Sequence, residues 1–332
     1  MRELQSSCPE IFEDEDIDGT SRQFLGWEVE LIHLGRGPIR RSSVVVPLGA
    51  TSIALVQVRR ATALRIVSAP SDFSLMSTSP SSPPPRVAAR PLVGGICLMF
   101  GPRAPIEIYL PKNCCVFILS VPCDATRRAG GSECFATLPI DTQTELRSLS
   151  AEHAALLSRC MDLLESFRRS GVPEVVAPQV QGRLQELLGA SAARLFYDSR
   201  PLPPETDEKA VRRRAVTRAC THIDAHLREP ITLDALCDAA GVRARTLEYG
   251  FREFYDVGPM AYLRSARLCR VRRELLKARG AGASVASAAR RWNFSHMGQF
   301  SRDYRLLFGE SPSSTLARRR SLLTPRRLLL NN

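Results

Sequence analysis

One short pattern of apolar, small and turn-forming residues occurs twice near the C-terminus. The copies are Leu233-x-x-Leu236-Cys237-x-x-Ala240-Gly241-Val242 and Val285-x-x-Ala288-Ala289-x-x-Trp292-Asn293-Phe294. Each keeps apolar residues on one helical face, then places Gly or Asn where the chain must leave the helix with positive φ. A second amphipathic stretch follows each copy, over Arg243–Tyr255 and Ser295–Phe308. Each copy therefore has the pattern of a helix, a tight turn and a second helix. The sequence predicts two helix-turn-helix units.

The repeat lies in a stretch whose helical pattern is nearly continuous from Asp207. A first helix is expected over Glu208–Leu227, and a long helix opened by Gly258-Pro259 is expected to reach about Ala278. Thr232 and Ser284 are placed to cap the first helix of each unit, Thr232 through the backbone N–H at Ala235 or close by. The long helix would set the two outer helices about one DNA turn apart, roughly 34 Å.

The basic charge of the chain is concentrated in this helical region. The chain has 46 Lys and Arg against 34 Asp and Glu, a net charge of +12. From Glu205 onward there are about 25 basic and about 13 acidic residues, so the remainder, with 21 of each, is neutral. Basic charge on surface helices can also serve solubility alone. Because this surplus coincides with the two predicted helix-turn-helix units, it indicates a polyanionic partner.

The first part of the chain has the pattern of a β-domain. Short β-type runs alternate with turn residues over Trp27–Leu34, Ser43–Val46, Ile53–Val58, Leu64–Val67, Phe73–Met76, Ile96–Phe100, Ile106–Leu110 and Cys115–Val121. Their even spacing favours a sandwich or small barrel over βαβ units. Ser77–Pro85 is a Ser/Pro tract, expected to form a long loop.

Between these regions lies a helical extension. Thr142–Arg169 has a helical period ended by Gly171 and Pro173, and Val180–Leu188 is expected to form a second short helix. The first helix has two equally open interpretations, a dimer seam or packing on its own domain. We therefore expect an α+β multidomain chain. Its parts are a poorly ordered N-terminus (1–23), a β regulatory domain (24–140), a helical dimerisation or packing segment (141–199), a linker (200–206), a DNA-binding domain (207–319) and a basic tail (320–332).

Several other functions lack support in the sequence. No apolar run approaches the roughly 20 residues of a membrane span, and the acidic N-terminus, Met1–Asp18, lacks the basic-then-apolar pattern of a signal peptide, so a cytoplasmic protein is expected. There is no Cys-x-x-Cys and no zinc-finger spacing, so no metal or cofactor is expected. We expect structural thiols, with a redox or metal sensor as the alternative, among residues that include Cys97, Cys114, Cys115, Cys123 and Cys134. No catalytic set can be placed, so no enzyme is expected.

One string in the second copy is more specific than a helix-turn-helix pattern. Ala288-Ala289-Arg-Arg-Trp292-Asn293-Phe294-Ser295 is followed by Gln299-Phe300-Ser301-Arg302-Asp303-Tyr304 and by Phe308-Gly309-Glu-Ser311-Pro312. Over about Arg212 to Arg319 the chain resembles the AraC/XylS transcription regulators. The resemblance implies seven helices, with two helix-turn-helix units joined by a linker helix.

The resemblance also implies which residues meet DNA. In the first unit the DNA-contact candidates are Arg243, Arg245, Glu248, Tyr249 and Arg252. In the second unit they are His296, Met297, Ser301, Arg302 and Arg305. The scaffold residues of both units are Leu236, Cys237, Gly241, Leu247, Phe251, Ala289, Trp292, Asn293, Phe294, Phe300, Tyr304 and Pro312.

The chain departs from the family pattern at several positions. Asn293 stands where Gly is usual, although Asn tolerates the left-handed conformation. Tyr249 replaces a frequent Arg, and Gly250 is expected to weaken its helix by about 1 kcal/mol relative to Ala. Because Met297 and Gly298 offer little hydrogen bonding, sequence readout is expected to depend on Arg245 and Arg302, with phosphate contacts supplying most of the affinity.

The β-domain is also similar to the N-terminal domain of one branch of this family, through Gly-Arg-Gly-Pro (35–38) and Leu-Ser-Val-Pro (119–122). This similarity implies a cupin-like barrel that senses a small molecule or mediates dimerisation. Because His33 is its single histidine before Ala136, metal-dependent catalysis is not expected. The expected function is a sequence-specific transcription regulator, more often an activator in this family.

The partner expected first is double-stranded DNA, with RNA polymerase, a small-molecule effector and a second copy of the chain as further candidates. An orphan regulator, controlled by a protein partner or by its abundance, is the first alternative. A thiol-reactive sensor or an enzyme with a DNA-binding tail is the second. An apolar pocket with converging polar groups would favour the effector, and a solidly filled barrel would disfavour it.

Overall fold

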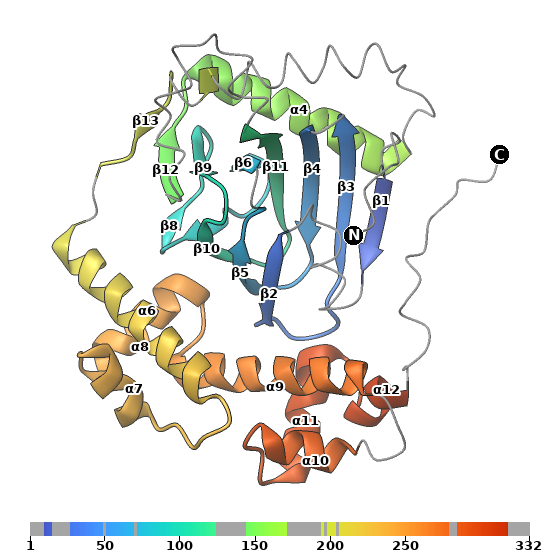
Figure 1. The fold of residues 1–332 in the computed structure, drawn as a ribbon, viewed down its shortest axis with the longest axis vertical. Coiled ribbons are helices and arrows are strands. Elements are labelled where there is room, and N and C mark those ends of the chain that lie inside the picture. The colour runs from blue at the N-terminus through green and yellow to red at the C-terminus, as the bar shows by residue number, and fades with distance from the viewer. Residues whose placement is uncertain are drawn as a thin grey trace.

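The computed structural model describes residues 10–14, 27–48, 51–69, 72–123, 144–170, 194–195, 198–203, 206–278 and 284–317. A β-domain lies above a helical domain, and a single helix runs along the boundary between them (Figure 1). The strands are β1 (Glu10–Asp14), β2 (Glu28–His33), β3 (Arg41–Leu48), β4 (Thr51–Val58), β5 (Thr62–Val67), β6 (Asp72–Thr78), β7 (Arg86–Val87), β8 (Arg90–Pro91), β9 (Ile96–Phe100), β10 (Pro105–Leu110), β11 (Cys114–Pro122), β12 (Thr144–Ser148) and β13 (Arg200–Pro201).

The strands form two antiparallel sheets. The larger has the order β1-β3-β4-β11-β6-β9-β12-β13, and the smaller has the order β2-β5-β10-β7-β8. A core that includes Trp27, Val56, Phe100 and Ile108 fills the space between them. All eight strands expected from the sequence are present, so the expectation of a β-domain built from two packed sheets or a small barrel is confirmed.

Strand β11 shows why the β-type runs in the sequence are apolar at nearly every position. Its Val116 and Ile118 face the core between the sheets. Its Phe117 and Leu119 face the opposite side, where they pack with Leu157 and Leu164 of helix α4 (Ala151–Ser170). Because successive side chains point to opposite faces, a strand covered on both sides has no polar face to present.

The structure differs from the expected helix over Thr142–Arg169 at its beginning. Residues Thr144–Ser148 form strand β12, which pairs antiparallel with β9, and the helix begins only at Ala151. Strand β13 pairs with β12, so the first residues of the expected 200–206 linker belong to the sheet. The cause is non-local, because the edge of β9 supplies backbone partners that a helical periodicity cannot reveal.

The N-terminus also differs from the expected poorly ordered segment. Glu10–Asp14 forms strand β1, paired antiparallel with β3 from Glu10↔Val45 to Asp14↔Arg41. The exposed edge of β3 offers backbone groups that β1 satisfies. The rest of the expected 1–23 segment, the expected helix Val180–Leu188, Cys134 and the 320–332 tail lie outside the described residues.

Within the described residues the C-terminal region has seven helices, the number that the resemblance implies. They are α6 (Asp207–His226), α7 (Leu233–Ala240), α8 (Ala244–Tyr255), α9 (Pro259–Lys277), α10 (Val285–Arg291), α11 (Met297–Phe308) and α12 (Pro312–Ala317). Both expected caps are present: the Thr232 hydroxyl accepts from Ala235 N at 3.1 Å, and the Ser284 hydroxyl accepts from Ser287 N at 3.1 Å. Gly241 and Asn293 have the expected positive φ, at 68° and 62°.

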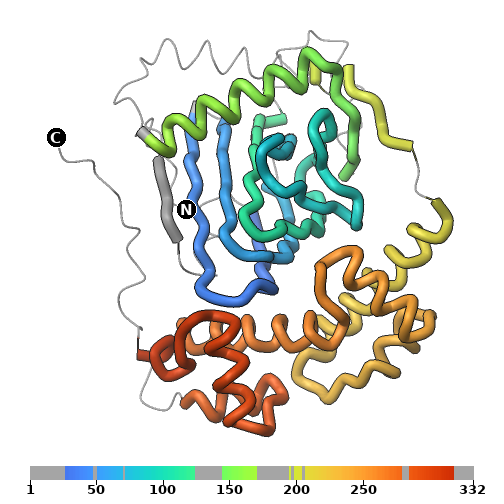
Figure 2. The backbone as a smooth tube through the Cα atoms, turned by 180° about the vertical axis from the view of Figure 1, so that it is seen from behind, coloured from blue at the N-terminus to red at the C-terminus, as the bar shows by residue number. Residues whose placement is uncertain are grey.

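Helix α9 is shared by the two domains. It lies beside β2, and Figure 2 shows it running beneath the β-domain from behind. One core cluster joins Leu31, Ile32 and Tyr109 of the smaller sheet to Phe251 and Leu263 of the helical domain. The smaller sheet is therefore buried on both faces, by the larger sheet on one side and by the DNA-binding candidate region on the other.

Candidate nucleic-acid interface

Helix α8 of the first unit has one buried face and one open face. Leu247 and Phe251 are fully buried, whereas Tyr249 is 57% exposed. Arg245 lies beside Tyr249, with its guanidinium 5.5 Å from the ring centroid and a 3.4 Å hydrogen bond to the hydroxyl. Arg252 pairs with Glu248 at 3.7 Å on the same surface. The first-unit candidates thus form a polar surface in which Tyr249 and Arg245 are joined.

Helix α11 of the second unit is organised in the same way. Phe300 and Tyr304 are buried, whereas Arg302 and Arg305 are exposed. His296 is the N-cap residue and is also exposed, and Ser301 is half-buried. Met297, also a DNA-contact candidate, is partly covered, because as the first residue of the helix it packs against the helical core. Arg302 and Arg305 are therefore the charged candidates that this helix leaves exposed.

Gly250 has a packing role that the sequence did not reveal. A Cβ at this position would lie 2.7 Å from Cγ2 of Val216 on α6. The residue is buried in α8, where the helix crosses α6 closely. The expected loss of helix stability at Gly250 is therefore offset by a close helix–helix approach that only Gly permits.

The arginines of α9 are engaged inside the protein. Arg264 pairs with Asp303 of α11 at 3.2 Å, and Arg267 donates to the carbonyl of Leu227 at 2.9 Å. Arg270 and Arg273 both pair with Glu30 of β2. The basic surplus of the helical region therefore overstates the charge available to DNA, because part of it holds the domain together.

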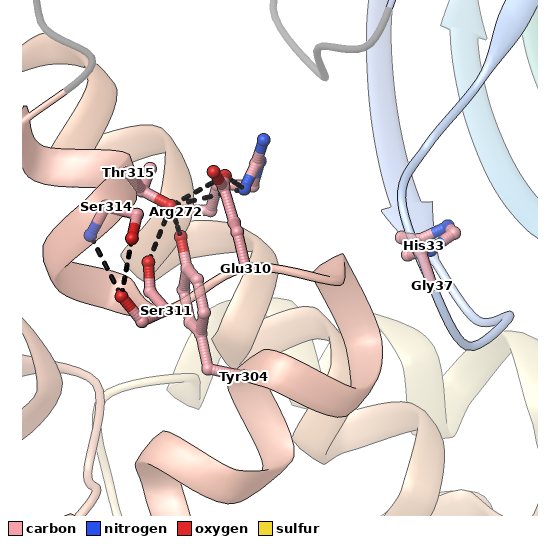
Figure 3. Close-up of polar contacts among 8 residues, drawn as sticks. All are labelled: His33, Gly37, Arg272, Tyr304, Glu310, Ser311, Ser314 and Thr315. Atoms are coloured by element: carbon pink, nitrogen blue, oxygen red, sulfur yellow. Dashed lines mark hydrogen bonds and ion pairs between the residues drawn. The ribbon is translucent and has the colours of Figure 1, made fainter.

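A buried ionic network closes the second unit (Figure 3). Arg272 is 3% exposed and pairs with Glu310, which follows α11. The Thr315 hydroxyl of α12 donates to Glu310 at 2.8 Å and accepts from the Tyr304 hydroxyl at 2.8 Å. The guanidinium carbon of Arg272 also lies 4.8 Å from the centroid of the Phe308 ring. Helices α9, α11 and α12 are thereby joined around one charge pair.

Polar contacts connect the β-domain to the first unit and to the helix before it. The Asp256 carboxylate, at the end of α8, pairs with Arg86 at 2.5 Å and accepts from the Tyr109 hydroxyl at 2.7 Å. Arg65 of β5 pairs with Asp224 of α6. No local sequence signal predicts these contacts, because each joins residues more than a hundred positions apart.

The loop after β2 reaches the second unit. The Gly37 backbone N–H donates to the Leu306 carbonyl at 3.0 Å. His33 stacks on Phe308 with ring centroids 6.0 Å apart, and its Nε2–H donates to the Gly37 carbonyl at 2.9 Å. Burial lowers the pKa of His33 to about 4, so the imidazole is neutral at neutral pH. This contact is thus packed and uncharged.

Three of the cysteines in the β-domain lie in its interior. Cys97, Cys114 and Cys115 are buried, and burial raises the pKa of the Cys97 thiol to about 12 and that of Cys115 to about 11. Such thiols remain protonated and unreactive at neutral pH. In the described residues no group of three His, Cys, Asp or Glu side chains could hold a metal ion, and no helix is long and apolar enough to span a membrane.

The helical domain matches a known family. Residues 236–318 match the family model described as a helix-turn-helix domain. The chain is 33% identical over 144 residues to the probable thc operon regulatory protein of Rhodococcus erythropolis, covering 43% of this chain and 42% of that protein. It is 25% identical over 235 residues to the XylDLEGF operon transcriptional activator 1 of Pseudomonas putida, covering 68% of this chain and 66% of that protein. The helical domain is thus a helix-turn-helix domain of the AraC/XylS type.

The AraC/XylS domain is a DNA-binding helix-turn-helix domain, as the Trp292–Tyr304 string indicated. Among solved structures, a probable AraC family transcriptional regulator from Rhodopseudomonas palustris CGA009 is 34% identical, with a TM-score of 0.30, over 32% of this chain and 98% of that one. The chain spans 42% of the first relative's length and 66% of the second's. The AraC/XylS relatives are named as regulators, and none of these matches is to an enzyme.

Proposed function

We propose that this protein is a sequence-specific DNA-binding transcription regulator, and that it activates transcription. The observation that carries this proposal is the pair of helices α8 and α11, each with a buried apolar face and an exposed polar one. Helix α9 holds them in one domain and packs against the β-domain, while α10 lies on the side of α9 away from the β-domain (Figure 1). The names of the XylDLEGF activators support activation.

We propose Arg245 and Tyr249 of α8, with Arg302 of α11, as the main readers of base edges. All three are exposed, and an arginine can bind the O6 and N7 atoms of guanine with its planar fork. The remaining candidates, Arg243, Arg252, His296 and Arg305, surround them and are placed to contact phosphates. Glu248, Met297 and Ser301 are partly buried, so their share of base contact is smaller.

Replacing Arg302 by Ala should cost about 1–3 kcal/mol of binding free energy and relax specificity at one base pair. The operator would first be selected from random duplexes with the full chain. Binding of the wild type and the variant would then be titrated against all single substitutions of that operator, at several salt concentrations. A uniform loss with a shallower salt slope and unchanged sequence preference would demote Arg302 to a phosphate contact.

We further propose that a small molecule controls the DNA-binding domain from a cavity between the domains. A cavity of about 630 Å³ is lined by Arg86, Tyr109 and Glu145 of the β-domain, and by Arg213 and Thr217 of α6. Leu98, Ile106, Leu146, Leu202 and Phe254 supply apolar surface.

The interior of the β-domain is a poorer candidate site, because side chains fill the space between the two sheets. A ligand touching both domains can favour one arrangement of them over another.

A compound screen by thermal shift tests this proposal on the full chain. A compound that binds the cavity should raise the melting temperature, and Ala210→Trp, which fills the cavity from α6, should abolish the shift. The same compound should change affinity for the selected operator at least about threefold. A compound whose shift survives Ala210→Trp, or which leaves DNA affinity unchanged, would favour the orphan regulator instead.

We also propose that α4 contributes to a homodimer. Its Leu157 and Leu164 pack on the larger sheet, whereas Leu156 and Leu163 are 40% and 51% exposed. These two leucines are seven positions apart and therefore share a helix face. One face of α4 thus packs on its own domain, and the other face supports the proposed dimer seam.

A further inference from the structure

The two halves of the helical domain make a direct contact through Arg228 and Trp292. Arg228 lies in the turn after α6, and its guanidinium carbon is 4.9 Å from the centroid of the Trp292 ring. Trp292 is the C-cap residue of α10, inside the turn of the second unit. A cation placed over an indole face is attracted by the ring's electrons. A residue that precedes the first unit thus packs on the turn of the second.

Helix α9 holds both partners of this contact. Arg267 donates to the backbone carbonyls of Leu227 and Glu229, on either side of Arg228. Glu274 accepts the Trp292 Nε1–H at 2.9 Å and also pairs with Arg291. Arg267 and Glu274 are seven positions apart, so they lie on the same face of α9 two turns from each other. Arg228, Arg267, Glu274 and Trp292 form a closed set, the inter-unit brace.

The brace restrains a motion that α9 by itself leaves open. A helix of the length of Pro259–Lys277 spans roughly 28 Å, and although Arg264 and Arg272 tie the second unit to it, neither joins that unit to the turn before the first unit. Gly258 precedes α9 as its N-cap residue, between the first unit and the helix. On DNA, a shift of one base pair moves a site by about 3.4 Å and rotates it by roughly one tenth of a turn. A pivot of either unit would therefore change which separation of sites both helices can reach.

We propose that the inter-unit brace sets the spacing between the two DNA sequences that α8 and α11 read. This inference rests on the proposed DNA-binding function. Arg228 is then a positioning residue, since it acts through Trp292 and the second unit. Losing it should change spacing preference, whereas losing a phosphate contact should weaken binding at every spacing equally.

The full-length wild type and Arg228→Ala would be selected against duplexes whose random region exceeds three helical turns. The wild type should enrich two sequence blocks at one spacing. The variant should enrich the same blocks with the spacing spread over one base pair in either direction. On fixed probes, adding or removing one base pair should cost the wild type roughly tenfold in affinity and the variant about threefold or less.

Two further variants sharpen the test. Arg290→Ala removes the same charge from an exposed position on α10, and should keep the single spacing of the wild type. Trp292→Phe keeps a ring but removes the Nε1–H that Glu274 accepts, and should broaden the spacing as Arg228→Ala does. The proposal about the brace would be overturned if Arg228→Ala kept the wild-type spacing. It would also be overturned if Arg228→Ala lost as much affinity as Arg290→Ala at every spacing, and in both cases the proposed DNA-binding function would stand. If the wild type enriches no sequence, the proposed function itself fails.

Discussion

Replacing Glu310 by Ala is expected to lower the free energy of unfolding of the helical domain by about 3–5 kcal/mol. Arg272, its partner, is 3% exposed and would keep its charge in the interior after the carboxylate is lost. The change would also remove an acceptor from Thr315, which itself accepts from the buried Tyr304 hydroxyl. The cost is large because the remaining charge is desolvated without its partner.

Trp292 can report on this change. The chain has two tryptophans, so in a Trp27→Phe background Trp292 is the single fluorophore, and it lies in the helical domain. Urea unfolding followed by its fluorescence should show the loss in Glu310→Ala. The double variant Arg272→Met/Glu310→Met should recover most of it, because no buried charge remains. A loss below about 1 kcal/mol in Glu310→Ala would mean that Arg272 is satisfied without this carboxylate.

Replacing Gly250 by Ala is expected to destabilise the helical domain by about 2–3 kcal/mol. Helix propensity alone predicts the opposite, a gain of about 1 kcal/mol. Packing should prevail because the new Cβ would lie 2.7 Å from Val216, a distance that real Cβ contacts essentially never show. Either the buried Val216 side chain must leave its rotamer or one of the two helices must move, and both helices carry core residues of the same cluster.

Gly298 provides the matched control. It lies in α11, and a Cβ added there would have no heavy atom within 4 Å outside its immediate chain neighbours and helix backbone, so Gly298→Ala meets open space. Propensity should then act alone, and the variant should be as stable as the wild type or up to about 1 kcal/mol more stable. The same urea measurement compares the two. Equal effects of the two substitutions would show that the α6–α8 contact does not constrain residue 250.

Local signals account for the features that the sequence predicted well. Thr232 and Ser284 cap their helices as expected, because a cap depends on residues within one turn. Gly241 and Asn293 leave their helices with positive φ for a similarly local reason. The apolar run Cys115–Val121 forms a strand as predicted, and it is apolar throughout because both of its faces are covered.

The features that the sequence did not predict depend on distant partners. Thr144–Ser148 has a helical period, yet the edge of β9 makes it a strand. The arginines of α9 look like DNA ligands in a count of charge, but Glu30 and Asp303 engage three of them. Met297 looks exposed on a helical wheel, and the core of its own domain partly covers it. Predicting this strand, these ion pairs and this burial requires knowing which elements contact one another in the folded chain.

The position of α9 has a consequence for how a signal could be transmitted. Strand β2 contacts this helix through Glu30 and through the backbone of His33, which donates to Cys269. The exposed candidate readers Arg245 and Arg302 lie on other helices. The β-domain is thus attached to the segment that separates the two reading helices. A rearrangement at this attachment would alter which operator geometry the protein accepts while every base-contacting side chain stays the same.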